Sequence, residues 1–265
     1  MELDYGTQIS PFPIKLSIGT LKKPKLRDIA EMSFDKFAFY EFMLKMTPEM
    51  YYTKLLKKSG GEQLWSSFSK KEKELLTTYE LITRTENLIE IYLEVFNYFF
   101  LETVIFREGF FILLKDNIKD EKTIEEKDIH GVISQENFDD VLNVIQQICC
   151  IYSKEEKIED MKFKNNLAKE IVEKMMKAQK TESAKNNLDL TKPNIISSVC
   201  GSHPSLNYIN IWDLTVFQLY DTFNRLQAYV IYNINSTSVA VWGDEKKSFD
   251  ISLWYKNQYD TKDKS

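Results

Sequence analysis

Two histidines and three cysteines are the side chains of this sequence most suited to catalysis. A thiol beside an imidazole can form a nucleophile and base pair, and Cys200 and His203 stand close together in "CGSHPS". Catalytic pairs normally come from distant segments that converge in the fold, so we interpret His203, before Pro204, as a turn residue. His130 stands beside Gly131 in a predicted strand region, where a turn or edge position explains it. The sequence therefore predicts no catalytic residue and a protein that is not an enzyme.

The sequence also predicts no metal or cofactor site. The acidic run "ENFDD" (136–140) stands at an expected helix start, where carboxylates complement the helix dipole. Its spacing differs from that of a calcium loop, and the cysteines, at 149, 150 and 200, lack zinc-ligand spacing. The glycines of "KKSGGEQ" lack the Lys-Ser/Thr ending of a phosphate-binding loop.

The charge balance makes a general nucleic-acid binder an unfavourable interpretation. The 265-residue chain carries 35 basic and 40 acidic residues, a net charge of −5, whereas phosphate binding needs a basic surface. The densest basic stretch, "KKPKLR" (22–27), is typical of a solvated arm beside a helix start. No secretory signal or membrane-spanning run is visible, and three unpaired cysteines are typical of a reducing compartment. We expect a cytoplasmic protein without a membrane partner.

Helices must form most of the scaffold, because the chain has only 8 Gly and 6 Pro. Residues 1–23 read as an extended arm with a short strand at "IKLSIGT". Helix caps then divide residues 24–100. Ser33, with Asp35, separates a helix at Lys25–Met32 from one starting at Phe34. Thr47 and Pro48 begin another, which stops at "SGG" (59–61). Ser69 and Glu72 form a capping box that opens one or two helices over residues 70–100.

The pattern changes to β-branched and aromatic residues over 103–134, which predicts an antiparallel hairpin or a three-stranded sheet. A helix capped by Ser134 or Asn137 follows, and a weaker seam, Leu167, Ile171, Met175 and Ala178, predicts one more. We expect a mainly α fold with a small antiparallel β hairpin or sheet (α+β), bundle-like and without repeats. The expected regions are an arm (1–23), a helical region (24–180) and an aromatic-rich C-terminal helical region (181–265), with the last two open to packing as one domain.

The segment "NYINIWDLTVFQLYDTFNRLQ" (207–227) is predicted to be a capped amphipathic helix. Asp213 is the first candidate for its N-cap, and Thr215 is the second. Aromatic residues at the density found here occur in cores, protein interfaces and ligand sites. The interface interpretation predicts a partner-binding set: Trp212, Phe217, Tyr220, Trp242 and Trp254.

Three segments carry a resemblance to a known group of proteins: "GTLKKPKLRDIAEMSFDKFAFYEFMLKMTPEMYY", "VISQENFDDVLNVIQQI" and "IISSVCGSHPSLNYINIWDLTVFQLYDTFNRLQ", the last followed by "VAVWG" and "FDISLWYK". They resemble tail-module proteins of tailed phages and prophages of Gram-positive hosts. The resemblance covers most of the chain and is loose over residues 153–187. It implies a non-enzymatic tail assembly chaperone that binds the tape-measure protein, the tail-tube protein or both, in the cytoplasm of the bacterial host.

A structural virion component is the alternative from another functional class. A minor capsid, connector or baseplate protein could share the helical, acidic and non-catalytic character of this sequence. The two classes differ in their fate, since a chaperone leaves the finished particle and a structural component stays in it. The client and the oligomeric state remain open at this point.

Overall fold

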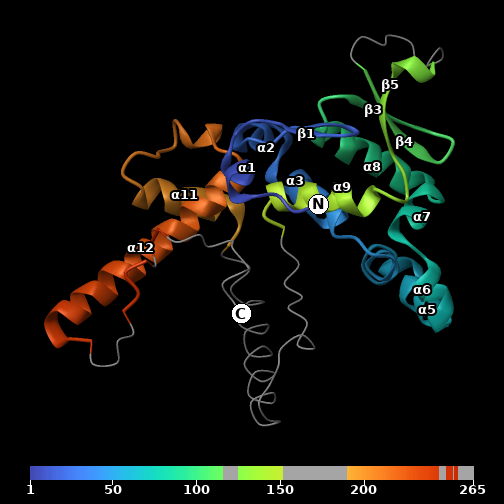
Figure 1. Cartoon of the computed structure of the whole chain (residues 1–265). Helices are drawn as coiled ribbons and strands as arrows, with labels where there is room; N and C mark the ends of the chain where they lie inside the picture. Colours follow the sequence, from blue (N-terminus) through green and yellow to red (C-terminus); the bar gives the residue numbers. More distant parts are fainter. Residues whose placement is uncertain (116–124, 152–189, 245–248, 253, 256–265) are drawn as a thin grey trace. The chain divides into compact units, whose positions relative to one another are not determined.

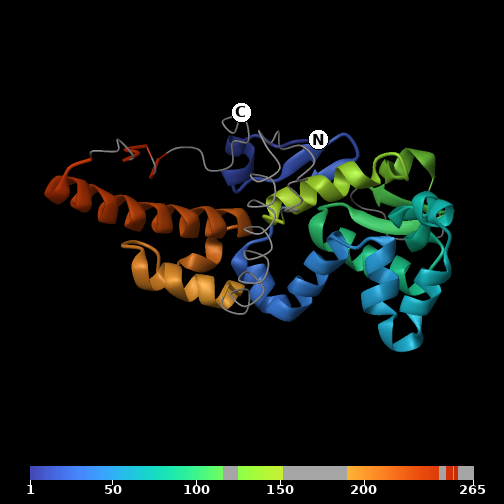
Figure 2. The same ribbon diagram turned by 90° about the horizontal axis from the view of Figure 1, so that it is seen from below.

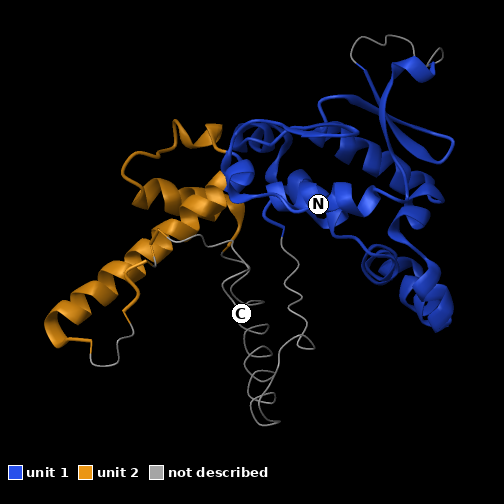
Figure 3. Ribbon diagram, in the orientation of Figure 1, with its two compact units in different colours: residues 1–151, 215–217 blue, residues 152–214, 218–265 orange. Residues whose placement is uncertain are grey.

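The computed structural model describes residues 1–115, 125–151, 190–244, 249–252 and 254–255. In this part of the chain the fold is mainly helical, with antiparallel sheets of two and three strands (Figure 1), which confirms the predicted α+β class. The chain divides into two compact units (Figure 3): Met1–Ile151 with Thr215–Phe217, and Tyr152–Leu214 with Gln218–Ser265. The expected region boundary at 180/181 and the seam at 167–178 lie outside the described residues.

Unit 1 begins with a short helix and a hairpin and continues through a series of short helices. Its elements up to the larger sheet are α1 (Tyr5–Ile9), β1 (Ile14–Leu16), β2 (Gly19–Leu21), α2 (Leu26–Met32), α3 (Phe34–Leu44), α4 (Pro48–Met50), the π-helix η1 (Tyr51–Leu55), the 3₁₀ helix η2 (Lys57–Ser59), α5 (Gly61–Ser67), α6 (Lys70–Leu75), α7 (Thr78–Thr83) and α8 (Glu86–Phe99). The sheet and the last helix of its main segment are β3 (Thr103–Arg107), β4 (Phe110–Leu114), η4 (Glu126–Asp128), β5 (Ile129–Ile133) and α9 (Phe138–Ile148).

Local caps divide these helices where the sequence predicts. The hydroxyl of Ser33 accepts from the N–H of Lys36 at 3.2 Å and starts α3. Thr47 caps α4 with Pro48 in its first turn, and Ser69 and Glu72 form the expected reciprocal box at α6. Residues 70–100 hold three helices rather than one or two. The additional start is at Thr77, whose hydroxyl accepts from the N–H of Glu80 at 3.1 Å and caps α7.

A three-stranded antiparallel sheet in the order β3-β4-β5 lies within the predicted 103–134 segment. Arg107 pairs with Phe110, so the turn between β3 and β4 has two residues. Both have positive φ, 53° at Glu108 and 85° at Gly109, which is the I′ geometry that matches the twist of a hairpin. The hydroxyl of Tyr79 lies 2.8 Å from the carbonyl of Gly109 and joins α7 to this turn.

An aromatic core lies between α7, α8, α9 and β4. The ring of Phe96 meets Phe111 at 5.0 Å in an edge contact, and Phe138 lies 5.3 Å from Tyr79 and 5.9 Å from Tyr92. All except Tyr79 are at most 1% exposed. The hydroxyl of Tyr92 donates to the carbonyl of Met43 at 2.7 Å, so this core also holds the end of α3.

The N-terminal residues pack within unit 1, where the sequence predicted an extended arm. Residues 1–23 form α1 and the β1–β2 hairpin, whose turn lies against β5. A Cβ built on Gly131 would lie only 2.2 Å from the carbonyl oxygen of Ile18, so a glycine is needed for this approach. The carboxylate of Glu102 accepts from the N–H of Thr20 in β2 at 2.8 Å. The amine of Lys23 donates to the carbonyls of Thr7 and Ser10, and burial lowers the pKa of Lys23.

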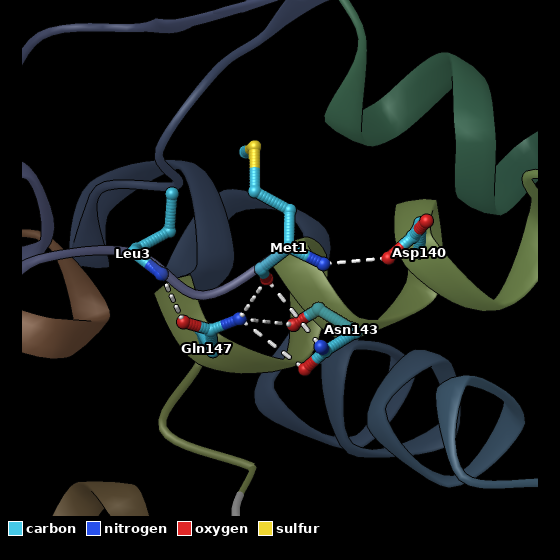
Figure 4. A network of polar contacts seen from close by, with 5 residues as sticks. All are labelled: Met1, Leu3, Asp140, Asn143 and Gln147. Atoms are coloured by element: carbon cyan, nitrogen blue, oxygen red, sulfur yellow. Dashed lines mark hydrogen bonds and ion pairs between the residues drawn. The ribbon is translucent and has the colours of Figure 1, made fainter.

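Polar contacts fasten the first residues to α9 (Figure 4). The N–H of Leu3 donates to the side-chain oxygen of Gln147 at 2.8 Å, and the amide nitrogen of Gln147 donates to the carbonyl of Met1 at 2.9 Å. The amino group of Met1 pairs with Asp140 at 2.5 Å. Asp140 is one of the acidic residues of "ENFDD", and its place in the first turn of α9 is the position expected from the sequence.

Candidate protein-binding surface on helix α12

Three helical elements of the C-terminal part frame the candidate surface: α11 (Lys192–Ser202), the 3₁₀ helix η6 (Ile211–Asp213) and α12 (Val216–Trp242). Figures 1 and 2 show α11 alongside the N-terminal part of α12, while the distal part of α12 continues past it. Thr215 directly precedes the first residue of α12, whereas Asp213 ends η6. The first-choice cap, Asp213, is therefore wrong, because the chain turns extended at Leu214 before the long helix begins.

Side-chain to backbone hydrogen bonds order the loop between α11 and η6. Nδ1 of His203 accepts from the N–H groups of Ser205 and Leu206 at 3.1 and 3.0 Å. The indole N–H of Trp212 donates to the carbonyl of Tyr208 at 2.8 Å. These hydrogen bonds hold the loop in a defined shape.

The proximal half of α12 in unit 2 is held by charged groups. The carboxylate of Asp221, 4% exposed as a residue, accepts from Nε of Arg225 one helical turn later at 3.0 Å. The amine of Lys192 lies 5.9 Å from the centre of the Tyr220 ring, within cation–π range. These contacts come from residues inside the same unit.

Phe249 and Trp254 lie against one face of distal α12. The ring of Tyr232 lies 5.6 Å from Phe249 and 6.4 Å from Trp254. A hollow of about 360 Å³ lies beside this contact, lined by His203, Thr222, Arg225, Leu226, Tyr229, Trp254 and Tyr255. Within the part of the chain that the structure describes, Phe249 and Trp254 therefore shield the Tyr232 side of the helix, and the residues of the opposite side are exposed.

The open side is apolar. Val230, Ile234 and Val241 are 55%, 63% and 64% exposed, and Trp242 is 81% exposed. At about 100° per residue the first three lie within about 40° of one another and about 180° from Tyr232. Residues 226–243 contain no Asp, Glu, Lys or Arg, so α12 itself places no charge beside these apolar residues. A solvent-facing helix normally carries charges on that face, and exposed contiguous apolar surface marks an interaction site.

The five residues of the predicted partner-binding set fall into different environments. Phe217 is fully buried and its ring lies 6.1 Å from Tyr5, so it supports the base of α12 from within unit 1. Trp212 and Tyr220 are half-buried and held by the contacts above. Trp242 and Trp254 are exposed; Trp242 is the last residue of α12, and Trp254 lies against Tyr232. Partner binding through these residues stays a prediction.

Sequence reasoning missed the aliphatic part of the surface. We define the α12 stripe as Val230, Ile234, Thr237 and Val241. The signal that could have identified it is the absence of charge over residues 226–243, because an apolar periodicity alone does not separate a core face from a partner face.

The candidate nucleophile and base show no activated geometry. Burial raises the pKa of the Cys200 thiol, whereas a reactive cysteine needs a lowered one. Nδ1 of His203 is occupied by two backbone donors. His130 lies on β5, with Nδ1 3.9 Å from the carboxylate of Glu102. Among the described residues there is no group of His, Cys, Asp and Glu that could hold a metal ion. Of the helices in the described ranges, none is long and apolar enough to cross a membrane.

Residues 179–259 match the family model described as the second domain of YomV, a Bacillus phage-type protein. The matched segment is less than a third of the chain and contains α11, η6 and α12. The matched segment includes α12, and this likeness suggests a phage-associated protein. A search of curated proteins and a search of solved structures found no match.

Proposed function

We propose that this phage-related protein is a non-enzymatic tail assembly chaperone that binds a helical segment of the tape-measure protein, the tail-tube protein or both. The observation that carries the proposal is the exposed, charge-free α12 stripe inside the phage-related domain. The resemblance of the chain to tail-module proteins supplies the class of client. In this role the protein acts in the host cytoplasm, before the particle is complete.

A helix is the client conformation that matches the stripe. The 27 residues of α12 span roughly 40 Å, and the four stripe residues recur every three or four positions along it. An amphipathic helix recognises such a surface through apolar residues at the same spacing. The stripe residues are uncharged and form no ion pairs with a client, so affinity would come from apolar burial and specificity from shape.

The size of the surface is appropriate for a reversible complex. Val230, Ile231, Ile234, Val241 and Trp242, at 50–81% exposed, present roughly 600 Å² of side-chain surface. Covering both partners would remove about 1,200 Å², at the low end of specific interfaces. Association and side-chain ordering costs offset much of the gain, so we expect micromolar affinity, which a chaperone needs in order to release its client.

Co-expression and pull-down test the proposal. The tagged full chain is expressed with the tape-measure protein and, separately, with the tail-tube protein of the same phage. We expect retention of at least one of them, loss of retention in Ile234→Lys, and retention in Asn235→Lys. Asn235 is the matched control because it adds the same charge one residue away on an exposed position off the stripe. Retention of neither protein by the wild type would sink the proposal.

Mass spectrometry of purified virions separates the chaperone from its structural alternative. A chaperone is absent from the finished particle or present only in traces. A copy number similar to that of a minor capsid, connector or baseplate protein would overturn the chaperone role and favour a virion component.

A further inference from the structure

The α12 stripe has the spacing of a seam between two helices. Its residues, Val230, Ile234, Thr237 and Val241, are separated by four, three and four positions, the alternation that keeps one face toward a partner helix. All four are exposed and all four are β-branched. In two-stranded assemblies β-branched residues are favoured at one of the two seam positions. The spacing thus describes a surface that a second helix of the same kind can cover.

On α12 itself, the positions that flank the stripe do not oppose a second copy of this chain. The flanking positions Leu226, Ile231, Asn233, Ser238 and Ala240 are uncharged. In paired helices, charges at these positions set partner choice, and like charges exclude self-association. Here two identical stripes meet without like-charge repulsion in either direction.

The area for a symmetric pair is at the low end of specific interfaces. Full burial of Val230, Ile231, Ile234, Val241 and Trp242 would remove about 1,200 Å² in total from an isologous pair, and Trp242 lies at the margin of this surface. Small residues beside the seam, Ser238 and Ala240, allow the two helices to approach. The face around Tyr232 is already covered by Phe249 and Trp254, which leaves the stripe as the side available for pairing.

We propose that in the free protein a second copy of this chain covers the α12 stripe, forming a homodimer through paired distal halves of α12. The client described above then displaces the second copy, and this exchange is the only part that rests on the proposed function. Pairing hides the apolar surface from water when no client is present. The dimer is therefore the resting state and the client-bound protein has one copy at the stripe.

Sedimentation equilibrium of the full chain tests the dimer. At about 100 μM we expect the wild type to sediment as a dimer, as an interface of this size allows. Ile234→Lys and, independently, Val241→Lys should each raise the dimer dissociation constant about tenfold or more, because each places a charge in the seam. Asn235→Lys should leave it unchanged. Circular dichroism of each variant verifies that its helical content is retained.

Two results would overturn the dimer: a wild-type chain that stays monomeric at about 100 μM, or a dimer that both folded stripe variants leave intact. The second result would place self-association on another surface. A monomeric wild type that still retains a tail protein would remove the dimer and leave the function standing. A stripe-dependent dimer that retains neither tail protein would leave the dimer standing and remove the proposed chaperone function.

Discussion

Replacing Tyr92 by Phe should make the stability of unit 1 less sensitive to alkali. Tyr92 is 0% exposed, and its hydroxyl donates to the carbonyl of Met43 at 2.7 Å. Burial raises the pKa of Tyr92 far above its ordinary value, so the folded chain keeps this phenol protonated at pH 11. The unfolded chain ionises it near pH 10. The stabilising contribution is therefore fully present below pH 10 and is lost as the pH rises above it.

The magnitude follows from two opposing contributions. Below pH 9, Tyr92→Phe loses one buried hydrogen bond, which costs about 1 kcal/mol. The carbonyl of Met43 keeps a partner in the N–H of Met46 at 3.0 Å, so no further desolvation penalty is added. Ionisation of the unfolded wild type reduces its stability by about 0.8 kcal/mol at pH 10.5 and about 1.4 kcal/mol at pH 11. The variant should equal or exceed the wild type in stability between these two pH values.

Urea unfolding followed by far-ultraviolet circular dichroism at pH 8, 9.5, 10.5 and 11 measures this difference. The other tyrosines are common to both proteins, so their titration cancels when the two free energies of unfolding are subtracted. A difference that stays constant from pH 8 to pH 11 would refute the reasoning. It would mean that the Tyr92 phenol ionises in the folded chain as readily as in the unfolded one.

Further predictions concern packing, turn geometry and the surface. Gly131→Ala should lower the free energy of unfolding by about 1–3 kcal/mol in urea titrations, because its Cβ meets the carbonyl of Ile18; Gly201→Ala, with no neighbour within 4 Å on α11, should instead stabilise by about 0.5–1 kcal/mol. Glu108→Asn should raise the free energy of unfolding in urea titrations by about 0.5 kcal/mol, because Asn adopts the positive φ of the I′ turn more readily. Trp242→Ala should change stability by less than about 0.5 kcal/mol and lower client retention in the pull-down about tenfold.

The parts of the fold that local chemistry determines could be predicted from the sequence. Ser33, Thr47 and Ser69 each start a helix through contacts with residues at most three positions away, so the signal is contained in a short window. Thr77 starts α7 by the same contact but lies within an apolar periodicity that continues past it, which hides the break. The close approach of the Ile18 backbone to Gly131 joins residues more than a hundred positions apart, and no local sequence pattern specifies it.

The exposed apolar face of α12 lies in the C-terminal region that the aromatic residues indicated, but its aliphatic residues are not in the predicted set. The aromatic residues drew attention to the C-terminal region, and Trp242 does lie on the exposed part of α12. Phe217 follows the same amphipathic pattern but is fully buried. A stripe of apolar residues is the same in sequence whether the chain itself or another molecule covers it, so periodicity alone could not separate these two residues.

The content of charged residues changes along α12, and this change distinguishes the stripe from an ordinary solvent-facing helix surface. The proximal half carries Asp221 and Arg225, which pair with each other at 3.0 Å on a partly buried side. Residues 226–243 carry no charge, although most of this length is exposed. A helix meant only for water would place Lys and Glu there, which add solubility at little cost in stability. Asn, Ser and Thr on the remaining positions keep the helix compatible with water, while the stripe between them remains available to another helix without any charge that must first be desolvated.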